Sequence, residues 1–315
     1  METTSRLSRH PVFADIEMGI GTSAWGDRLF WGYGQGYSEQ DLHEACDFCL
    51  NAGIRLFDTA ETYGSGKSET LLGEFVDNSQ SNVRIMTKFM PYPWRITRIA
   101  FNRALHASLD RLKRKKVDIY MIHWPYPPLS IDSWMEAMAA AHEEGLIDAV
   151  GVSNYSRDQM LRACETLVKH GIRLASNEVE YNLLDRSVET NQLLSTCADL
   201  GVALIAYSPL AKGVLTGKYT VGNPVRGIRE QYYSRKRLEE IQPLIREMRN
   251  IGMDHDGKTP GQVALNWLIC KGALPIPGVK NLMQAQQNLG SLGWRLTPEA
   301  VSRLDDISRK ISQGH

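Results

Sequence analysis

The chain has no excess of charge of either sign: among its 315 residues, 36 lysines and arginines balance 36 aspartates and glutamates. Nucleic acid and acidic membrane surfaces select for a basic patch, so this balance argues against both as partners. No hydrophobic run approaches membrane-spanning length, and residues 1–20 hold no apolar core of signal-peptide length. We therefore expect a cytoplasmic protein with neither a nucleic-acid nor a membrane partner.

Cysteine is also scarce. Five cysteines in a chain of this length do not make a disulfide framework, so reduced thiols are the better interpretation. Cys46 and Cys49 form a lone C-x-x-C pair in the middle of a predicted helix, on its apolar face, whereas redox pairs sit at helix N-termini. No second pair completes a zinc site, so we expect no metal.

The chain is rich in short apolar runs that alternate with longer amphipathic ones. Eight strands alternating with eight helices favour parallel pairing through right-handed crossovers. Eight such units in roughly 250 residues match a (β/α)8 TIM barrel, and we expect a single domain over 1–315. A doubly wound open sheet is the alternative. The predicted strands are 16–20, 54–58, 83–88, 117–122, 147–152, 174–179, 202–207 and 273–276, and the predicted helices are 38–52, 67–76, 97–112, 131–144, 156–170, 187–200, 259–271 and 281–290.

Two segments fall outside this repeat. Residues 211–256 form a long polar insertion after the seventh strand, with a helical run of its own at 230–251, and residues 291–315 form a tail. Insertions after barrel strands lie over the C-terminal mouth, where active sites sit. We expect both the long loop and the tail to cover that mouth.

Four polar side chains follow apolar runs at the ends of neighbouring strands. Asp58 and Tyr63 lie in FDTAETYG, Lys88 in IMTKF and His123 in DIYMIHWP, on the second, third and fourth strands. Neighbouring strands lie about 5 Å apart, so these side chains can meet at one mouth. The sequence therefore predicts a proton-relay site there.

The chemistry of the four groups assigns roles. A tyrosine side chain has a pKa of about 10. A nearby Lys88 ammonium would lower the pKa of Tyr63 by favouring the phenolate. Asp58 would hold Lys88 charged, Tyr63 would donate a proton, and His123 would polarise the same oxygen. This set fits carbonyl reduction by hydride and the reverse oxidation. No side chain donates hydride, so a nicotinamide is implied.

Two glycine segments resemble nucleotide motifs. Gly19-x-Gly21-x-x-Ala24 matches the dinucleotide fingerprint, but that motif requires a helix to open at once, and an aromatic and glycine-rich loop follows instead. A strand ending in a tight turn is the better interpretation, with a Rossmann dehydrogenase as an alternative. The GSGKS segment resembles a P-loop but has Glu61 where the motif needs a glycine.

The motifs together resemble one family, the aldo-keto reductases. The segments FDTAETYG, TKF and DIYMIHWP carry the resemblance at the N-terminal side, and GVSNY, AYSPLA, LTGKY and IPGVK continue it downstream. The match spans almost the whole chain. It is closer to the bacterial, plant and potassium-channel β-subunit branch than to the vertebrate aldose reductases.

The resemblance implies a barrel that binds NADPH across its C-terminal mouth, with Asp58, Tyr63, Lys88 and His123 as a catalytic tetrad and Tyr63 as the general acid. It further implies that Tyr207 stacks on the nicotinamide and that 208–217 wraps the pyrophosphate. The cofactor contacts it implies are Trp25, Asp58, Ser153, Asn154, Glu178, Tyr207, Ser208, Pro209, Leu210, Lys212, Gly213, Lys218, Gly278, Lys280, Gln284, Gln287 and Asn288.

Three of these positions depart from the family pattern. Glu178 stands where the family commonly has a Gln, Gln284 where many members have an Arg, and Gly278 where some have a Lys. A carboxylate cannot donate a hydrogen bond unless it is protonated. Lys280 is left as the main cation for the 2′-phosphate of NADPH. We therefore expect preference for NADPH with appreciable use of NADH.

Aromatic residues gather in the predicted mouth loops and suit an apolar carbonyl substrate with one polar end. The predicted substrate contacts are Trp25, Trp31, Tyr63, His123 and Trp124. The best-supported function is an NADPH-dependent, reversible reduction of a small-molecule aldehyde or ketone. The alternative is a cofactor-binding regulatory subunit of the channel β-subunit type with little turnover. The substrate is open between aldehydes, ketones and sugar-like hydroxycarbonyls, and the oligomeric state is open too.

Overall fold

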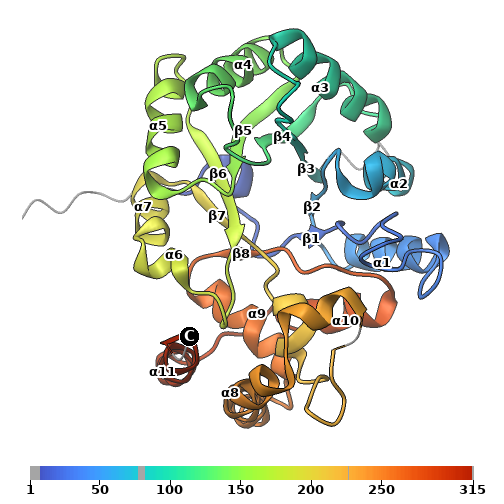
Figure 1. The fold of residues 1–315 in the computed structure, drawn as a ribbon, viewed down its shortest axis with the longest axis vertical. Helices are drawn as coiled ribbons and strands as arrows, with labels where there is room; N and C mark the ends of the chain where they lie inside the picture. Colours follow the sequence, from blue (N-terminus) through green and yellow to red (C-terminus); the bar gives the residue numbers. More distant parts are fainter. Residues whose placement is uncertain (1–7, 77–81, 226, 314–315) are drawn as a thin grey trace, which may run out of the picture.

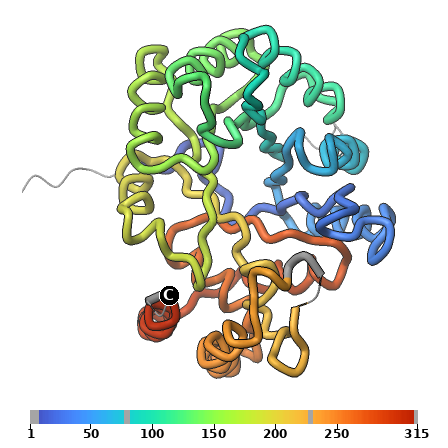
Figure 2. Tube along the Cα trace, viewed as in Figure 1, coloured from blue at the N-terminus to red at the C-terminus, as the bar shows by residue number. Residues whose placement is uncertain are grey.

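The computed structural model describes residues 8–76, 82–225 and 227–313. Its eight strands are all parallel and pair in chain order, each with the next, so the Cα trace runs once around a central sheet (Figures 1 and 2). The strands are β1 (Ile20–Gly21), β2 (Leu56–Asp58), β3 (Arg84–Phe89), β4 (Val117–Ile122), β5 (Ile147–Ser153), β6 (Leu174–Glu180), β7 (Ala203–Tyr207) and β8 (Leu274–Pro275).

Backbone hydrogen bonds close the sheet into a barrel. The amide of Gly19 donates to the carbonyl of Pro275, and the amide of Gly21 donates to the carbonyl of Pro277, both at 3.1 Å. A parallel bridge between Gly21 and Gly278 continues this pairing. The predicted (β/α)8 barrel is confirmed, and the open doubly wound sheet is excluded. After β1 the chain makes turns, and the next helix begins only at Glu39, so the structure also rules out the dinucleotide fingerprint at Gly19.

Helices surround the barrel (Figure 1). They are α1 (Glu39–Asn51), α2 (Lys67–Phe75), α3 (Arg98–Leu112), α4 (Ile131–Glu143), α5 (Arg157–Val168), α6 (Ser187–Thr190), α7 (Leu193–Leu200), α8 (Arg235–Met253), α9 (Pro260–Cys270), α10 (Leu282–Leu289) and α11 (Pro298–Gln313). The predicted helix 187–200 is broken between α6 and α7 because Gln192 has φ 64° and the Asn191 side chain accepts from the Leu193 amide. Among the described helices, none is both long and apolar enough to cross a membrane.

The first helix illustrates how local sequence sets the element boundaries. Ser38 caps α1 and forms a capping box with Asp41, and Gly53 follows the helix with φ 94°. Cys46 and Cys49 are fully buried on its inner face. Burial raises the pKa of the Cys49 thiol to about 12, so this pair packs as apolar side chains rather than as a reactive dithiol.

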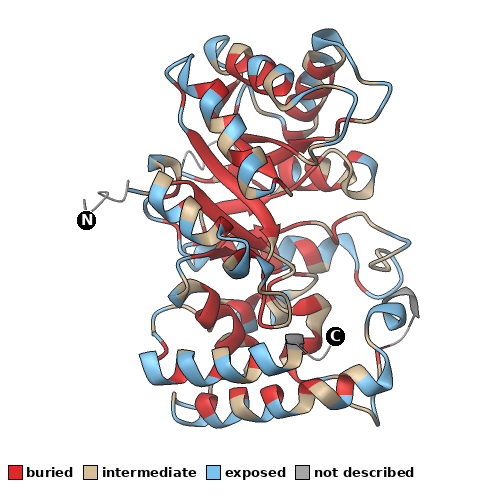
Figure 3. Ribbon diagram, turned by 60° about the vertical axis from the view of Figure 1, so that its left-hand side comes forward, coloured by how far each residue is buried: buried red, intermediate tan, exposed pale blue. Residues whose placement is uncertain are grey.

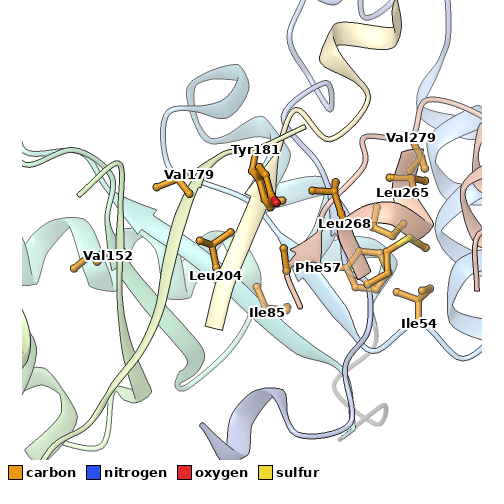
Figure 4. Close-up of a cluster of buried hydrophobic side chains, with 14 of the residues drawn as sticks. Ile54, Phe57, Ile85, Val152, Val179, Tyr181, Leu204, Leu265, Leu268 and Val279 are labelled. Carbon is orange, nitrogen blue, oxygen red and sulfur yellow. The ribbon is translucent and has the colours of Figure 1, made fainter. Parts of the chain in front are cut away.

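Period-two alternation divides the core into two parts. Inward-facing side chains such as Leu56, Met86 and Ile119 fill the barrel interior, and Phe13 from the 3₁₀ turn Pro11–Phe13 joins them. Outward-facing side chains such as Phe57 pack against the helices, where Figure 4 shows them beside α9 residues. Figure 3 shows that the buried residues concentrate in the strands and on the inner faces of the helices.

The alternation also explains how polar groups come to the mouth. Leu56, Met86 and Ser176 face inward, and the next inward positions on the same strands are Asp58, Lys88 and Glu178. The barrel interior therefore changes from mostly apolar to polar within two residues of each of these strands. These polar positions lie at the C-terminal ends of the strands, as in other barrels of this type.

The insertion after β7 and the C-terminal tail occupy different places. The insertion contributes the 3₁₀ segments Ala211–Thr216 and Gly227–Tyr232 before it continues as α8. The predicted position of the tail over the mouth is wrong: α11 packs against α8 on the outside of the barrel. Asp305 anchors it by accepting from the Trp267 indole at 3.0 Å and pairing with Lys271 at 3.1 Å. Its amphipathic face buries Ala300 and Leu304, which requires an apolar partner surface.

Gly151 gives a stability prediction, because β5 shifts register against β6 between Val150 and Gly151. A Cβ at Gly151 would lie 2.5 Å from Ser176 Oγ and 2.6 Å from Met121 Cγ. We expect Gly151→Ala to lower the free energy of unfolding by about 1–3 kcal/mol. Gly36→Ala is the control, since a Cβ added at Gly36 would meet no atom within 4 Å. Equal thermal midpoints for the two variants would contradict this packing argument.

Candidate active site

A cavity of about 780 Å³ opens at the C-terminal ends of the strands. This volume lies within the usual range of small-molecule and cofactor sites. The predicted residues that line it are Trp31, Asp58, Tyr63, His123, Trp124, Ser153, Asn154, Glu178, Tyr207, Ser208, Pro209, Leu210, Lys212, Gly213, Lys218, Gly278, Lys280, Gln284, Gln287 and Asn288.

Lys88 lies beneath the floor of this cavity with no exposed surface. Its Nζ is 2.5 Å from Asp58 Oδ1 and donates to the Thr59 carbonyl at 3.0 Å. The Tyr63 hydroxyl lies 3.4 Å from the same nitrogen, and Glu178 Oε2 lies 3.3 Å from it. The side chains predicted to meet do meet, and a second carboxyl group joins them.

Burial governs the electrostatics of this cluster. Burial acts to lower the pKa of Lys88, but Asp58 and Glu178 more than offset that effect and hold the pKa above its ordinary value. For Tyr63, burial raises the pKa, and the Lys88 charge opposes the rise without cancelling it. The predicted lowering of the Tyr63 pKa is therefore wrong for the net shift, although Lys88 acts in the predicted direction.

His123 follows β4 and faces Tyr63. The two rings are 5.9 Å apart and nearly perpendicular, at 83°. Burial and then the Lys88 charge lower the pKa of His123 to about 3, so the imidazole is neutral at ordinary pH. A neutral imidazole has one N–H donor and one acceptor nitrogen. Its Nδ1 is buried and has no protein hydrogen-bond partner among the described residues, while the residue as a whole lines the cavity.

Glu178 was predicted as a cofactor contact, and its pairing with Lys88 was missed. Burial, with a further contribution from the Asp58 charge, raises the pKa of the Glu178 carboxyl to about 8, while Lys88 opposes the rise. The signal was present in the sequence. In the predicted strand, Glu178 stands two residues after Ser176 and so shares the inward face, as Lys88 does on its own strand.

A polar wall follows β5 and β7. Asn154 adopts the left-handed φ of 62°, and its Nδ2 donates to the His123 carbonyl and to Ser153 Oγ, both at 3.0 Å. The Tyr207 hydroxyl donates to Asn154 Oδ1 at 3.0 Å. These bonds fix the orientation of the Asn154 amide, and they hold one edge of Tyr207 so that its ring forms part of the cavity lining.

The segment after β7 has an unusual backbone. Ser208, Ala211, Lys212 and Gly213 all have positive φ, between 48° and 93°. Successive turns of this kind point backbone N–H groups into a shared hollow that suits an anion. Lys212 adds a cation over the Tyr232 ring, 4.7 Å from its centroid. The segment therefore combines strained turns with positive charge along one side of the cavity.

The other end of the cavity lies at the start of α10. Lys280 donates to the Trp31 carbonyl at 2.9 Å and lies over the Trp31 and Tyr37 rings, at 4.6 and 4.8 Å. The Lys280 amide donates to Gln284 Oε1 at 3.1 Å. A helix N-terminus favours anions, and the lysine reinforces that preference here.

Aromatic side chains form part of the mouth. Trp31 and Trp124 line the cavity, and Trp124 stacks on Tyr126 with centroids 5.4 Å apart and planes within 5°. Trp25 does not join them, contrary to the prediction. It is fully buried, and its indole N–H donates to the Val279 carbonyl at 3.0 Å. That hydrogen bond holds the indole beneath the segment before α10 rather than in the cavity.

Sequence reasoning also missed the contribution of α9. The start of this helix brings Thr259, Gly261 and Gln262 to the cavity, and Met283 of α10 lies beside them. Thr259 and Gln262 form a capping box, a signal that identified the helix start but not its position in space. Only the packing of α9 against the segment Ala211–Thr216 shows that this helix start faces the site.

A parallel barrel with a buried lysine, two carboxyls, a phenol and an imidazole at its C-terminal mouth has the arrangement of a barrel enzyme. Comparison with known proteins agrees. The family model described as Aldo/keto reductase family matches residues 17–309. The chain belongs to the Aldo/keto reductase family, which places it among the oxidoreductases.

Individual members of known sequence or structure are similar to this protein over most of its chain. A protein of Arabidopsis thaliana named pyridoxal reductase, chloroplastic, is 41% identical over 93% of this chain and 83% of its own length. An uncharacterized oxidoreductase of Mycobacterium bovis is 35% identical over 93% of this chain and 89% of its own. A crystal structure of an aldo-keto reductase from Klebsiella pneumoniae in complex with NADPH is 26% identical, with a TM-score of 0.72, covering 93% of this chain and 90% of that one.

The buried ion pair gives a prediction for stability. Lys88→Met removes the cation that pairs with Asp58 at 2.5 Å, so we expect the free energy of unfolding to fall by about 3–5 kcal/mol. Adding Asp58→Asn to that variant removes one uncompensated charge and recovers part of the loss. Urea unfolding of the two single variants and the double variant measures the coupling. If the loss of unfolding free energy in the double variant equals the sum of the losses in the two single variants, the result would contradict an ion pair at this position.

Proposed function

We propose that this protein is an NADPH-dependent oxidoreductase that reversibly reduces an aldehyde or ketone to an alcohol, with Tyr63 as the general acid. One observation carries the proposal: Tyr63 lines the cavity while its hydroxyl lies 3.4 Å from a fully buried lysine ammonium and its ring faces a neutral His123. A phenol beside a fixed cation is a proton donor suited to an oxygen that gains negative charge.

The residues of the cavity fit a nicotinamide dinucleotide. Glu178, His123, the Asn154 amide, the positive-φ segment after β7 and Lys280 are distributed along the cavity. Their order suits an amide, a pyrophosphate and a further phosphate in turn. A family member of known structure is described as bound to NADPH. When bound, this cofactor would supply the hydride that no side chain can provide.

The tetrad would then act on the carbonyl oxygen. His123, being neutral, would donate one hydrogen bond to that oxygen, and the Tyr63 hydroxyl would donate a second and then its proton. Lys88 stabilises the phenolate that remains, because its ammonium is held charged by Asp58 at 2.5 Å. Burial raises the pKa of Tyr63, so its proton stays on the phenol until the oxygen becomes basic.

The aromatic mouth supports a planar substrate. Trp31 and Trp124 line the cavity, and the Trp124 ring is held in place by stacking on Tyr126. Flat aromatic surfaces favour aromatic partners by stacking. One relative is named as a pyridoxal reductase, so aromatic aldehydes, with pyridoxal first, are the substrates we propose to test. Five free thiols fit a reducing compartment, and we propose a cytoplasmic location on that basis.

Tyr63→Phe tests the assigned acid. We expect kcat for carbonyl reduction to fall by roughly 10²–10⁴-fold, the range typical of a lost general acid, while NADPH still binds. Tyr120→Phe is the matched control because its hydroxyl is buried, has no hydrogen-bond partner among the described residues and faces the outer core. Stopped-flow and steady-state NADPH oxidation measure the rates. Undiminished turnover in Tyr63→Phe would refute the acid role.

The same assay addresses the regulatory alternative. A panel of aldehydes and ketones, pyridoxal included, is offered to the wild-type protein with NADPH in excess. Steady consumption supports the enzyme. Tight NADPH binding with negligible turnover on the whole panel would instead support a cofactor-binding regulatory subunit.

Lys280→Met tests how the cofactor is chosen. Loss of a hydrogen bond to a charged group costs about 1.5–3 kcal/mol, so we expect NADPH affinity to fall by roughly 10–100-fold. NADH lacks the 2′-phosphate, so its affinity should change much less. Fluorescence titration with both cofactors measures this, with Lys116→Met as a control at an exposed ion pair before β4. An equal loss for the two cofactors would show that Lys280 does not contact the 2′-phosphate.

A further inference from the structure

We propose that Glu178 carries a proton in the working enzyme and acts as a positioning residue that leaves the Lys88 ammonium free to support Tyr63. The inference rests on the proposed function, because it concerns the acid strength of Tyr63. It starts from a surplus of carboxyl groups. Asp58 and Glu178 both lie within ion-pair distance of one lysine, at 2.5 and 3.3 Å, and both are almost completely buried.

Lys88 has fewer N–H donors than there are acceptor oxygens around its nitrogen. An ammonium has three N–H groups. Asp58 Oδ1 and the Thr59 carbonyl take two of them, at 2.5 and 3.0 Å. Tyr63 and Glu178 Oε2 then compete for the third, at 3.4 and 3.3 Å. The third N–H donates to one of these two oxygens at a time, and the protonation state of Glu178 decides which oxygen accepts it.

The charge balance favours a proton on one carboxyl. Two ionised carboxyls against one ammonium would leave a net negative charge in a buried site, and such a charge is costly. The groups that face Glu178 from the other strands are Asp58, Lys88, Tyr63 and Tyr207, and only Lys88 is cationic. The neighbouring His123 is neutral because burial and Lys88 hold its pKa near 3.

Geometry assigns that proton to Glu178 rather than to Asp58. Asp58 holds the shorter contact with Lys88, at 2.5 Å, whereas Glu178 Oε2 lies 3.3 Å from the same nitrogen. Burial and then the Asp58 charge raise the pKa of Glu178, and Lys88 opposes that rise. The carboxyl group with the longer contact to the ammonium is the less stabilised as an anion, so Glu178 is the group that keeps the proton.

Loss of this proton would weaken the acid. An ionised Glu178 would draw the third Lys88 N–H away from Tyr63 and add negative charge beside the phenolate that must form. Both effects make Tyr63 a poorer proton donor. The rate of carbonyl reduction should therefore decline as Glu178 ionises. Burial raises the pKa of its carboxyl to about 8, which sets the pH at which this decline is expected.

Glu178→Gln tests the inference, because the amide has nearly the same shape but cannot ionise. In wild type we expect the alkaline fall of kcat/KM to begin near pH 8, and in Glu178→Gln we expect that fall to move upward by at least one pH unit. Glu180→Gln is the control: it makes the same change on the same strand, but its carboxyl pairs with Lys212 at 3.7 Å. An alkaline limb identical in wild type and Glu178→Gln would overturn the proposal.

A second measurement needs no catalysis. Folding raises the pKa of Glu178 from an ordinary value of 4.5 to about 8. Its contribution to the free energy of unfolding is therefore fully present below pH 4.5, the pKa in the unfolded chain, and is lost as pH rises through about 8, the pKa in the folded protein. Glu178→Gln lacks this decline. We expect its urea midpoint, relative to wild type, to increase from about pH 5 to about pH 8, whereas a constant difference would overturn the proposal.

The two measurements separate the possible failures. If Tyr63→Phe reduces carbonyls as fast as wild type, the proposed function fails while the stability comparison still reports on the Glu178 proton. If Tyr63→Phe is inactive and both Glu178→Gln comparisons show no change with pH, the proposed function stands and the role of Glu178 fails.

Discussion

A lysine ammonium with no access to solvent is the constraint on which this structure depends. Lys88 is tolerated inside the barrel only because Asp58, the Thr59 carbonyl and Glu178 surround its nitrogen. That compensation must come from neighbouring strands, and therefore the register of β2, β3 and β6 has to be correct before the site exists. The Lys88 site thus links the folding of the barrel to its chemistry, since an error in pairing would leave a charge buried without a partner.

The remainder of the site is arranged around that centre by backbone features. Positive φ angles occur at Asn154, at Ser208 and along 211–213, and four of these five residues line the cavity. These conformations cost free energy and persist where the surrounding structure enforces them. The hydrogen bonds from Asn154 to His123 and from Tyr207 to Asn154 connect β4, β5 and β7 across the mouth.

Much of this arrangement was readable in the sequence, for identifiable reasons. Strands and helices follow from period-two and period-3.6 patterns, and capping residues such as Ser38 mark helix starts. Asp58, Lys88 and His123 were found because each ends an apolar run. The inward face of Glu178 was readable, but three other features were not: its partner across the barrel, the burial of Trp25 and the course of α11. Each depends on a contact between residues far apart in the chain, which no local pattern encodes. The upward shift of the Tyr63 pKa was missed for a related reason, because burial is a property of the assembled fold.

The change from apolar to polar side chains along the barrel axis has a consequence for how such a protein can change over time. On β3, Met86 fills the interior and Lys88 belongs to the site, and only one outward-facing residue separates them. Leu56 and Asp58 on β2 show the same division. A substitution at the lower position alters packing, whereas one at the upper position alters chemistry. Selection can therefore remodel the reacting end while the supporting end stays as it is, and a design that transplants only the upper layer should keep this boundary.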